Sequence, residues 1–162
     1  MTKTIRSLVL VAAGLLCPIA EAQERLAFVP LPEACRLLDT RVVAAPAGGA
    51  LEPGVIRGVQ ADGGPCGVPI EAKAIQTNVT ATNTKGAGFL SVMRPTGHIP
   101  ANPEALTSIL NFSGPGQTVA NAAFIQLGSR LGHNWDGSFW IFSAVSGTDV
   151  VIDVSGYYVL AP

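Results

Sequence analysis

Charged side chains are scarce in this chain: Asp, Glu, Lys and Arg make up 13% of its residues, and the formal net charge is -1. Nucleic acids and anionic membranes are bound by strongly basic surfaces, so the sequence argues against both as main partners. Hydrophobic residues make up 48% of the chain. Disordered chains instead combine low hydrophobicity with high charge. The chain is therefore expected to fold around a core.

Histidine is also scarce, with only His98 and His133 present. Neither lies in a zinc-binding spacing, and the chain has no Gly-x-Ser-x-Gly elbow and no glycine-rich phosphate loop between a strand and a helix. The sequence therefore predicts a protein that is not an enzyme and needs no cofactor or metal. A Ser/His/Asp set can still assemble in space from distant residues, which leaves a small secreted hydrolase as an alternative.

Long apolar runs are missing except at the start, where residues 1–22 are typical of a secretory signal peptide. Lys3 and Arg6 precede the apolar run Ser7–Ala20, and Ala20-Glu21-Ala22 gives the small-x-small pattern of a cleavage site. Cleavage there leaves a single domain of residues 23–162, released or held at the cell surface without a membrane span. That domain has eight basic and ten acidic residues.

Two alternatives to a cleaved signal peptide are weaker. A membrane-spanning helix needs about 20 apolar residues, whereas this run is shorter and contains Pro18. Lipid attachment at Cys17 is disfavoured, because Leu16 and Gly14 stand where a small residue and a leucine are usual.

Cysteine is rare as well, and Cys35 and Cys66 are the two that follow the signal peptide. In an exported chain an isolated pair is most simply a disulfide. A metal site or a redox pair is the alternative, but the chain has no Cys-x-x-Cys spacing and no histidine near either cysteine in the sequence.

Short apolar and β-branched runs recur between turn residues along the rest of the chain. The expected strands are 35–41, 55–60, 72–82, 89–93, 107–112, 119–127, 139–145 and 149–160. About eight short antiparallel strands predict an all-β sandwich, with a closed barrel as the alternative. The alanine-rich stretch 120–123 allows one short helical turn.

The last of these strands, Asp149–Leu160, is the most strand-like run in the chain, because β-branched and aromatic residues dominate it. Strict alternation places Val150, Ile152, Val154, Tyr158 and Leu160 on one face. With the preceding run it predicts a final hairpin that buries at least one face.

Several short motifs occur in a fixed order: Cys35-Arg36-Leu37-Leu38-Asp39-Thr40-Arg41, Cys66-Gly67-Val68-Pro69, Asn78-Val79-Thr80 and Asp149 to Tyr158. This series resembles an uncharacterised domain of exported and surface proteins of soil bacteria, notably acidobacteria and actinobacteria. The resemblance covers nearly all of residues 23–162. It implies an extracellular β-domain without an assigned activity, and it carries over no catalytic or binding residue.

Three charged residues stand out within these motifs: Asp39, Arg41 and Asp153. A functional interpretation makes the aspartates an acid and a base, or calcium ligands. The interpretation we prefer is an internal network in which Arg41 bridges Asp153 or Asp39, because no second carboxylate cluster accompanies them.

The segment 132–137 is the one place where an aromatic ring, an amide, a carboxylate and an imidazole are close in sequence. Trp135 offers a flat face for a sugar ring, while Asn134 and Asp136 offer hydrogen bonds to its hydroxyls, with His133 beside them. The alternative is that Trp135 packs over the end of the sandwich.

The function expected from these observations is that of a non-enzymatic exported or cell-surface interaction module. A carbohydrate-binding domain that uses the 132–137 loop is the first alternative. The partner is accordingly an extracellular glycan or another surface protein, and open strand edges also allow self-association.

Overall fold

The computed structural model describes residues 24–42, 48–95, 107–128 and 136–162. The strands in these ranges are β1 (Leu26–Asp39), β2 (Ile56–Gln60), β3 (Ala74–Thr82), β4 (Ala87–Met93), β5 (Leu110–Ser113), β6 (Val119–Gln126), β7 (Ser138–Ala144) and β8 (Asp149–Leu160). The described residues form no helix that could cross a membrane. The predicted signal peptide, residues 1–22, lies outside them.

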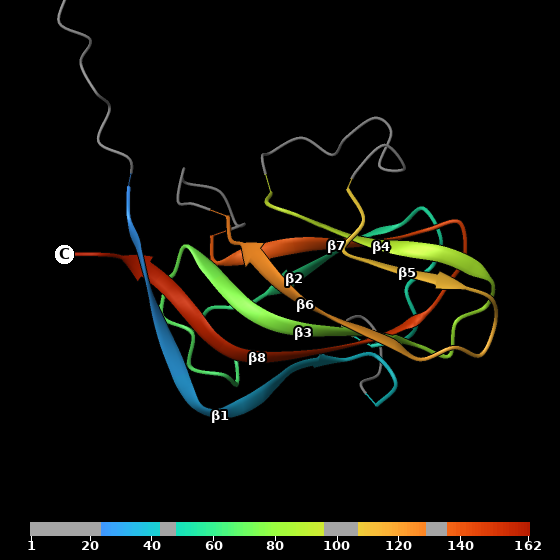
Figure 1. Cartoon of the computed structure of the whole chain (residues 1–162), viewed down its shortest axis with the longest axis horizontal. Coiled ribbons are helices and arrows are strands. Elements are labelled where there is room, and N and C mark those ends of the chain that lie inside the picture. The colour runs from blue at the N-terminus through green and yellow to red at the C-terminus, as the bar shows by residue number, and fades with distance from the viewer. Residues whose placement is uncertain (1–23, 43–47, 96–106, 129–135) are drawn as a thin grey trace, which may run out of the picture.

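The strands form two antiparallel sheets of four that pack face to face (Figure 1). The strand order is β1-β8-β3-β6 in the first sheet and β2-β7-β4-β5 in the second. Each sheet keeps two edges, and the sheets do not close on one another. The predicted β-sandwich of eight strands is therefore confirmed, and the alternative of a closed barrel is not the observed architecture.

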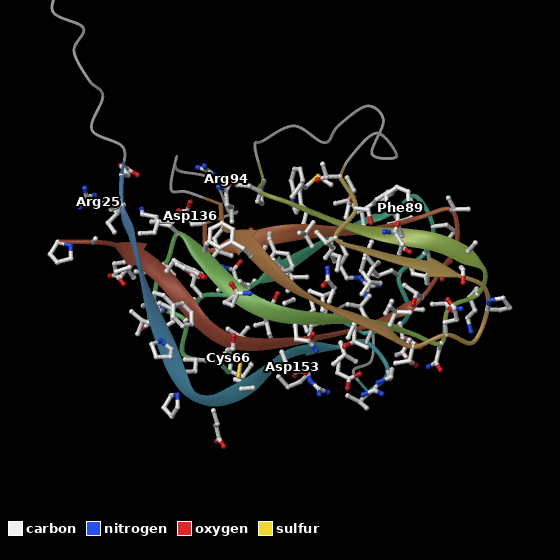
Figure 2. The ribbon with its side chains drawn as sticks, viewed as in Figure 1. Arg25, Cys66, Phe89, Arg94, Asp136 and Asp153 are labelled. Carbon is white, nitrogen blue, oxygen red and sulfur yellow. A yellow bond between two sulfur atoms is a disulfide. The ribbon has the colours of Figure 1, made fainter. Side chains whose placement is uncertain are left out.

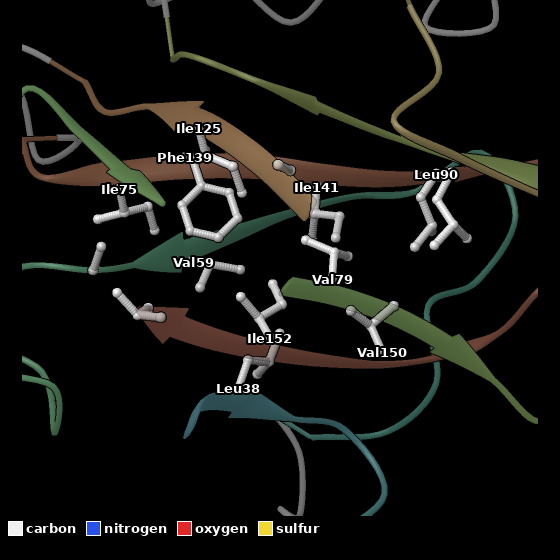
Figure 3. Close-up of a cluster of buried hydrophobic side chains, with 14 of the residues drawn as sticks. Leu38, Val59, Ile75, Val79, Leu90, Ile125, Phe139, Ile141, Val150 and Ile152 are labelled. Carbon is white, nitrogen blue, oxygen red and sulfur yellow. The ribbon is translucent and has the colours of Figure 1, made fainter. Parts of the chain in front are cut away.

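The hydrophobic core lies between the two sheets (Figure 3). Ile75, Val79 and Ile152 enter it from the first sheet, and Phe139 and Ile141 enter it from the second; all five side chains are fully buried. Burying a side chain of this size contributes about 1.5 to 3 kcal/mol relative to leaving it exposed. The core thus fixes which face of the first sheet points inward and which is left for contacts with other molecules.

The first strand is much longer than the sequence predicted. It begins at Leu26 and includes Pro30 and Pro32, whereas the sequence predicts a strand that begins at Cys35. The reason is its position: β1 is an edge strand, paired only with β8, and proline is tolerated there because its missing N–H can face away from the sheet. The pairing with β8 is interrupted between Pro30 and Cys35.

The helical turn that the alanine-rich stretch 120–123 allowed is also absent. These residues belong to β6, which pairs with β3 without interruption from Val119 to Gln126. The helix propensity of alanine amounts to less than about 1 kcal/mol per residue, so the continuous ladder outweighs it.

Candidate functional site

A β-bulge at Ser155 decides which face each later side chain of β8 occupies. Val154 and Gly156 lie opposite consecutive residues of β3, so Ser155 is an extra residue in the ladder. An extra residue of this kind shifts the alternation of side chains by one position. Tyr157 therefore packs against the core, and Tyr158 turns to the outer face. The uninterrupted alternation that the sequence predicted for this strand is wrong beyond Val154.

Five apolar side chains gather on the outer face of the first sheet, where β1 begins and β8 ends. Leu26 and Phe28 of β1 lie opposite Leu160 and Tyr158 of β8. Phe124 of β6 adds a third ring, which contacts that of Tyr158. The exposed fractions are 46% for Phe28, 45% for Phe124, 44% for Leu160 and 41% for Leu26. We call these five residues the aromatic face.

A glycine allows the ring of Phe28 to lie against the sheet. A Cβ atom at Gly156 would overlap this ring and would come within 2.6 Å of the Val29 carbonyl oxygen. The ring centroids of Phe28 and Tyr158 are 5.1 Å apart with planes tilted by 47°, and those of Phe124 and Tyr158 are 4.9 Å apart with planes at 71°. Both separations lie in the range of favourable aromatic pairs. The rings therefore form a fixed, twisted row that rises from three strands.

Hydrogen-bonding groups lie beside the rings. The Tyr158 hydroxyl donates to Oε1 of Gln76 at 3.1 Å, and the exposed Ser155 hydroxyl donates to the Gln76 carbonyl oxygen at 3.3 Å. Exposed rings bordered by amides and hydroxyls suit a ligand that has both apolar faces and hydroxyl groups, as a sugar does. This surface is not evident in the sequence, because its residues come from three strands that are far apart in the chain.

The predicted ligand-binding loop is described only at its end. His133, Asn134 and Trp135 lie outside the described residues, so their role in ligand binding stays a prediction. Asp136 is described, and its backbone carbonyl accepts a hydrogen bond of 2.6 Å from Nε2 of Gln60. This bond ties Asp136 to the end of β2.

Asp136 lines a cleft of about 470 Å³. Figure 2 labels this residue at the end of the sandwich. Lys73, Arg94 and Gln126 are among the other residues that line the cleft, as is Leu26 of the aromatic face. The lining of the cleft thus includes polar and charged side chains, and the cleft borders the aromatic face at Leu26. It is large enough for a small polar ligand.

The charged residues of the motifs form a cluster on the same outer face, further along β1 and β8. Arg41 donates to both carboxylate oxygens of Asp39, through Nε at 2.8 Å and Nη2 at 2.6 Å. Arg36, which the sequence analysis did not single out, bridges Asp39 at 2.8 Å and also pairs with Asp153. Arg41 therefore bridges Asp39, whereas the partner of Asp153 is Arg36.

The side chain of Asp39 is buried, and the two arginines are about half exposed. Hydrogen bonds from the Arg41 side chain and backbone, together with the charge of Arg36, hold the pKa of Asp39 well below its ordinary value of 3.8. A carboxylate held in this way is a poor proton acceptor at neutral pH. The cluster is thus better suited to joining the end of β1 to β8 than to acid–base chemistry.

Asp39→Asn is expected to remove part of the acid sensitivity of the fold. Because the pKa is lower in the folded state, the ionised Asp39 stabilises the protein above pH 3.8, and that contribution is lost as the pH falls below it. The variant should be less stable than the wild type at neutral pH, and the difference should shrink on acidification. Urea unfolding from neutral pH down to about pH 2 measures this, with Glu33→Gln, an exposed carboxylate of β1, as the control. A constant difference across the range would contradict the assignment.

The predicted disulfide between Cys35 and Cys66 is confirmed, with the two Cα atoms 5.5 Å apart. It joins the middle of β1 to the segment that follows β2, and Figure 2 shows it on the side of the first sheet. No group of three or more His, Cys, Asp or Glu residues is placed to hold a metal ion within the described ranges. The cysteines therefore serve as a covalent link between the edge strand and the rest of the fold.

Comparison with protein-family models, with curated proteins and with solved structures found no match to this chain. The resemblance to the exported bacterial domain stays a prediction. The surface of the molecule is therefore the guide to its function, and the aromatic face is the most distinctive feature of that surface.

Proposed function

We propose that this chain is an exported, non-enzymatic interaction module that binds an extracellular glycan through its aromatic face. The observation that carries the proposal is the row of three rings, in which Phe28 and Phe124 are exposed and the partly buried Tyr158 contacts both. Exposed apolar patches of this kind on a folded domain are typical of interaction sites. Export is supported by the signal-peptide pattern of residues 1–22 and by the disulfide, since disulfides persist outside the reducing cytoplasm.

The geometry of the rings favours one kind of glycan. Neighbouring ring planes are inclined by 47° and 71°, so the row is twisted rather than flat. A flat crystalline surface needs coplanar rings, whereas a single chain that turns along its length can follow a twisted row. The expected ligand is therefore a soluble or loosely packed polysaccharide chain, and peptidoglycan strands belong to this class.

The test is a glycan array that includes peptidoglycan fragments, probed with protein produced from the full-length chain in an exporting bacterial host. Phe28→Ala is expected to weaken binding roughly tenfold or more, as removal of an aromatic anchor does. Phe89→Ala is the matched control, because Phe89 is a half-buried phenylalanine of the other sheet. No binding across the array, or binding that Phe28→Ala leaves unchanged, would contradict the proposal, and glycan hydrolysis by the sample would contradict its non-enzymatic part.

The second candidate function is carbohydrate binding in the cleft beside Asp136. Its support is the mixed lining of that cleft, in which Lys73 and Gln126 accompany Asp136 and can hydrogen-bond to sugar hydroxyls. The same array separates the two candidates. Binding that is lost in Asp136→Asn and in Trp135→Ala but kept in Phe28→Ala would place the ligand in the cleft and not on the aromatic face.

A further inference from the structure

We propose that two copies of this protein associate through their β6 strands, which pair antiparallel about a two-fold axis at Ala123 and join the two first sheets into one of eight strands. The partner is a second copy of the chain. The proposal rests on the β6 edge alone and does not depend on glycan binding.

The four edge strands of the sandwich differ in how well they resist pairing with another chain. β1 carries Pro30, Pro32 and Glu33, and prolines and charges are the usual protection of an edge. β2 has five residues, and its Arg57 donates to the carbonyl of Gly49 at 2.7 Å, so part of the 48–50 segment lies against it. β5 has only four residues. Short length, charge and proline therefore protect three of the four edges.

β6 lacks all of these protections. Its eight residues, Val-Ala-Asn-Ala-Ala-Phe-Ile-Gln, include no charged residue and no proline. It pairs with β3 on one side, and it is the last strand of its sheet on the other. Five of its residues are exposed, and four of them, Ala120, Ala122, Phe124 and Gln126, alternate along the strand. A long, uncharged and exposed edge of this kind is a template for another strand.

The hydrogen bonds to β3 show which backbone groups of β6 point outward. The N–H of Leu127, the residue after β6, donates to the Lys73 carbonyl at 2.9 Å. The Ala123 carbonyl accepts a bond of 3.0 Å from the Thr77 hydroxyl. The backbone groups of Ala123 and Leu127 are therefore directed toward β3. Bonding direction alternates along an antiparallel strand. The N–H and C=O groups of the even-numbered residues, among them Ala122 and Phe124, are therefore directed away from β3.

A two-fold axis at Ala123 places the outward backbone groups of one copy opposite the outward backbone groups of the other. It places Ala122 of each copy opposite Phe124 of the other, and Ala120 opposite Gln126. Both pairs consist of residues with outward N–H and C=O groups, so they can exchange backbone hydrogen bonds. A ring opposite a methyl group fits without crowding, and no like charges meet across the axis. The backbone of the strand is thus complementary to that of its own copy, and the opposed side chains of the outer face neither crowd nor repel one another.

The pairing would also extend the outer surface. Phe124 is the ring of the aromatic face nearest the β6 edge, since Tyr158 and Phe28 lie on β8 and β1. Joining two β6 strands therefore brings the two aromatic faces onto one continuous sheet. A polymer that contacts both faces would be held by two linked sites, which raises the overall affinity.

The test is the molar mass in solution, measured by sedimentation over a wide range of concentrations on protein produced from the full-length chain in an exporting host. The wild type is expected to form a dimer. Ala122→Lys and Ala122→Pro should each weaken dimerisation roughly tenfold or more, the first by placing charge on the edge and the second by removing an outward N–H. Because that N–H does not bond to β3, proline at this position leaves the fold intact. Ser155→Lys, which adds the same charge to β8, should leave the dimer unchanged.

A second measurement tests the position of the axis. In protein cleaved after Ala22, which lacks Cys17, Ala123→Cys places one free thiol per chain where the two strands cross, because Cys35 and Cys66 are already bonded to each other. Directly opposed residues of an antiparallel pair are close enough for a disulfide, so mild oxidation should give a covalent dimer in high yield. A monomeric wild type at every concentration, a dimer that both Ala122 variants leave intact, or an absence of cross-linking in Ala123→Cys would overturn the proposal.

Discussion

Replacing Cys35 and Cys66 together with alanine is expected to lower the free energy of unfolding by about 3 to 4 kcal/mol. The bond closes a loop of 31 residues in sequence separation, and opening that loop raises the conformational entropy of the unfolded chain. Urea unfolding of the variant and of the wild type, each with and without a reducing agent, measures the loss. Reduction should destabilise the wild type by a similar amount and should leave the variant unchanged.

The stability lost with the disulfide is expected to be lost mainly in the β1–β8 ladder. The disulfide lies in the middle of β1, where pairing with β8 is interrupted between Pro30 and Cys35. Hydrogen exchange should therefore rise first in the β1–β8 ladder and less in β4 and β7 of the other sheet. An unfolding midpoint unaffected by the double substitution, or a uniform rise in exchange, would show that the bond does not hold β1 in place.

Gly156→Val is expected to destabilise the protein by about 2 to 3 kcal/mol, although valine is the better strand former by up to about 1 kcal/mol. A Cβ atom at this position overlaps the Phe28 ring and approaches the Val29 carbonyl oxygen to 2.6 Å, so β1 has to move away from β8. Thermal and urea unfolding measure the loss. Gly114→Val is the matched control, because a Cβ atom there meets nothing within 4 Å.

A double-mutant cycle assigns the effect to the ring. Gly156→Ala and Phe28→Ala should each destabilise the protein, but the combined variant should lose less than the sum, since removing the ring frees the space that the new methyl group needs. The relief should be partial, because the Val29 carbonyl remains in place. Strict additivity would mean that the ring does not pack on Gly156. Glycan binding by the Gly156→Ala variant should also fall, because the ring row would be displaced.

The parts of the fold that follow from local pattern could be predicted from the sequence. The alternation in the third predicted strand, 72–82, matches β3, where Ile75 and Val79 are buried, and the pair Cys35 and Cys66 is bonded as expected. In both cases the signal lies in the residues themselves. The period of two in β3 requires only that one face be buried, and the disulfide requires only two cysteines in an oxidising compartment.

The parts that depend on pairing between distant strands could not be predicted. The prolines of β1 are tolerated because that strand lies at an edge, but a run with two prolines is equally typical of a loop, so residues 26–39 alone do not predict a strand. The bulge at Ser155 is defined by the register against β3, and it alone sends Tyr158 outward. Arg36 pairs with Asp153 because these residues lie opposite each other on β1 and β8, a register that the sequence does not display.

The first and last strands lie side by side and antiparallel, with Leu26 opposite Leu160, so the chain enters and leaves the sandwich at one end (Figure 1). A force that pulls these two ends apart acts on the hydrogen bonds of the β1–β8 ladder one after another. Each bond therefore breaks singly and at low force. Peeling stops at Cys35, because its covalent bond to Cys66 anchors the strand to the body of the fold. On the β1 side, the segment from Leu26 to the residue before Cys35 is therefore all that such a force can release before the disulfide bears the load.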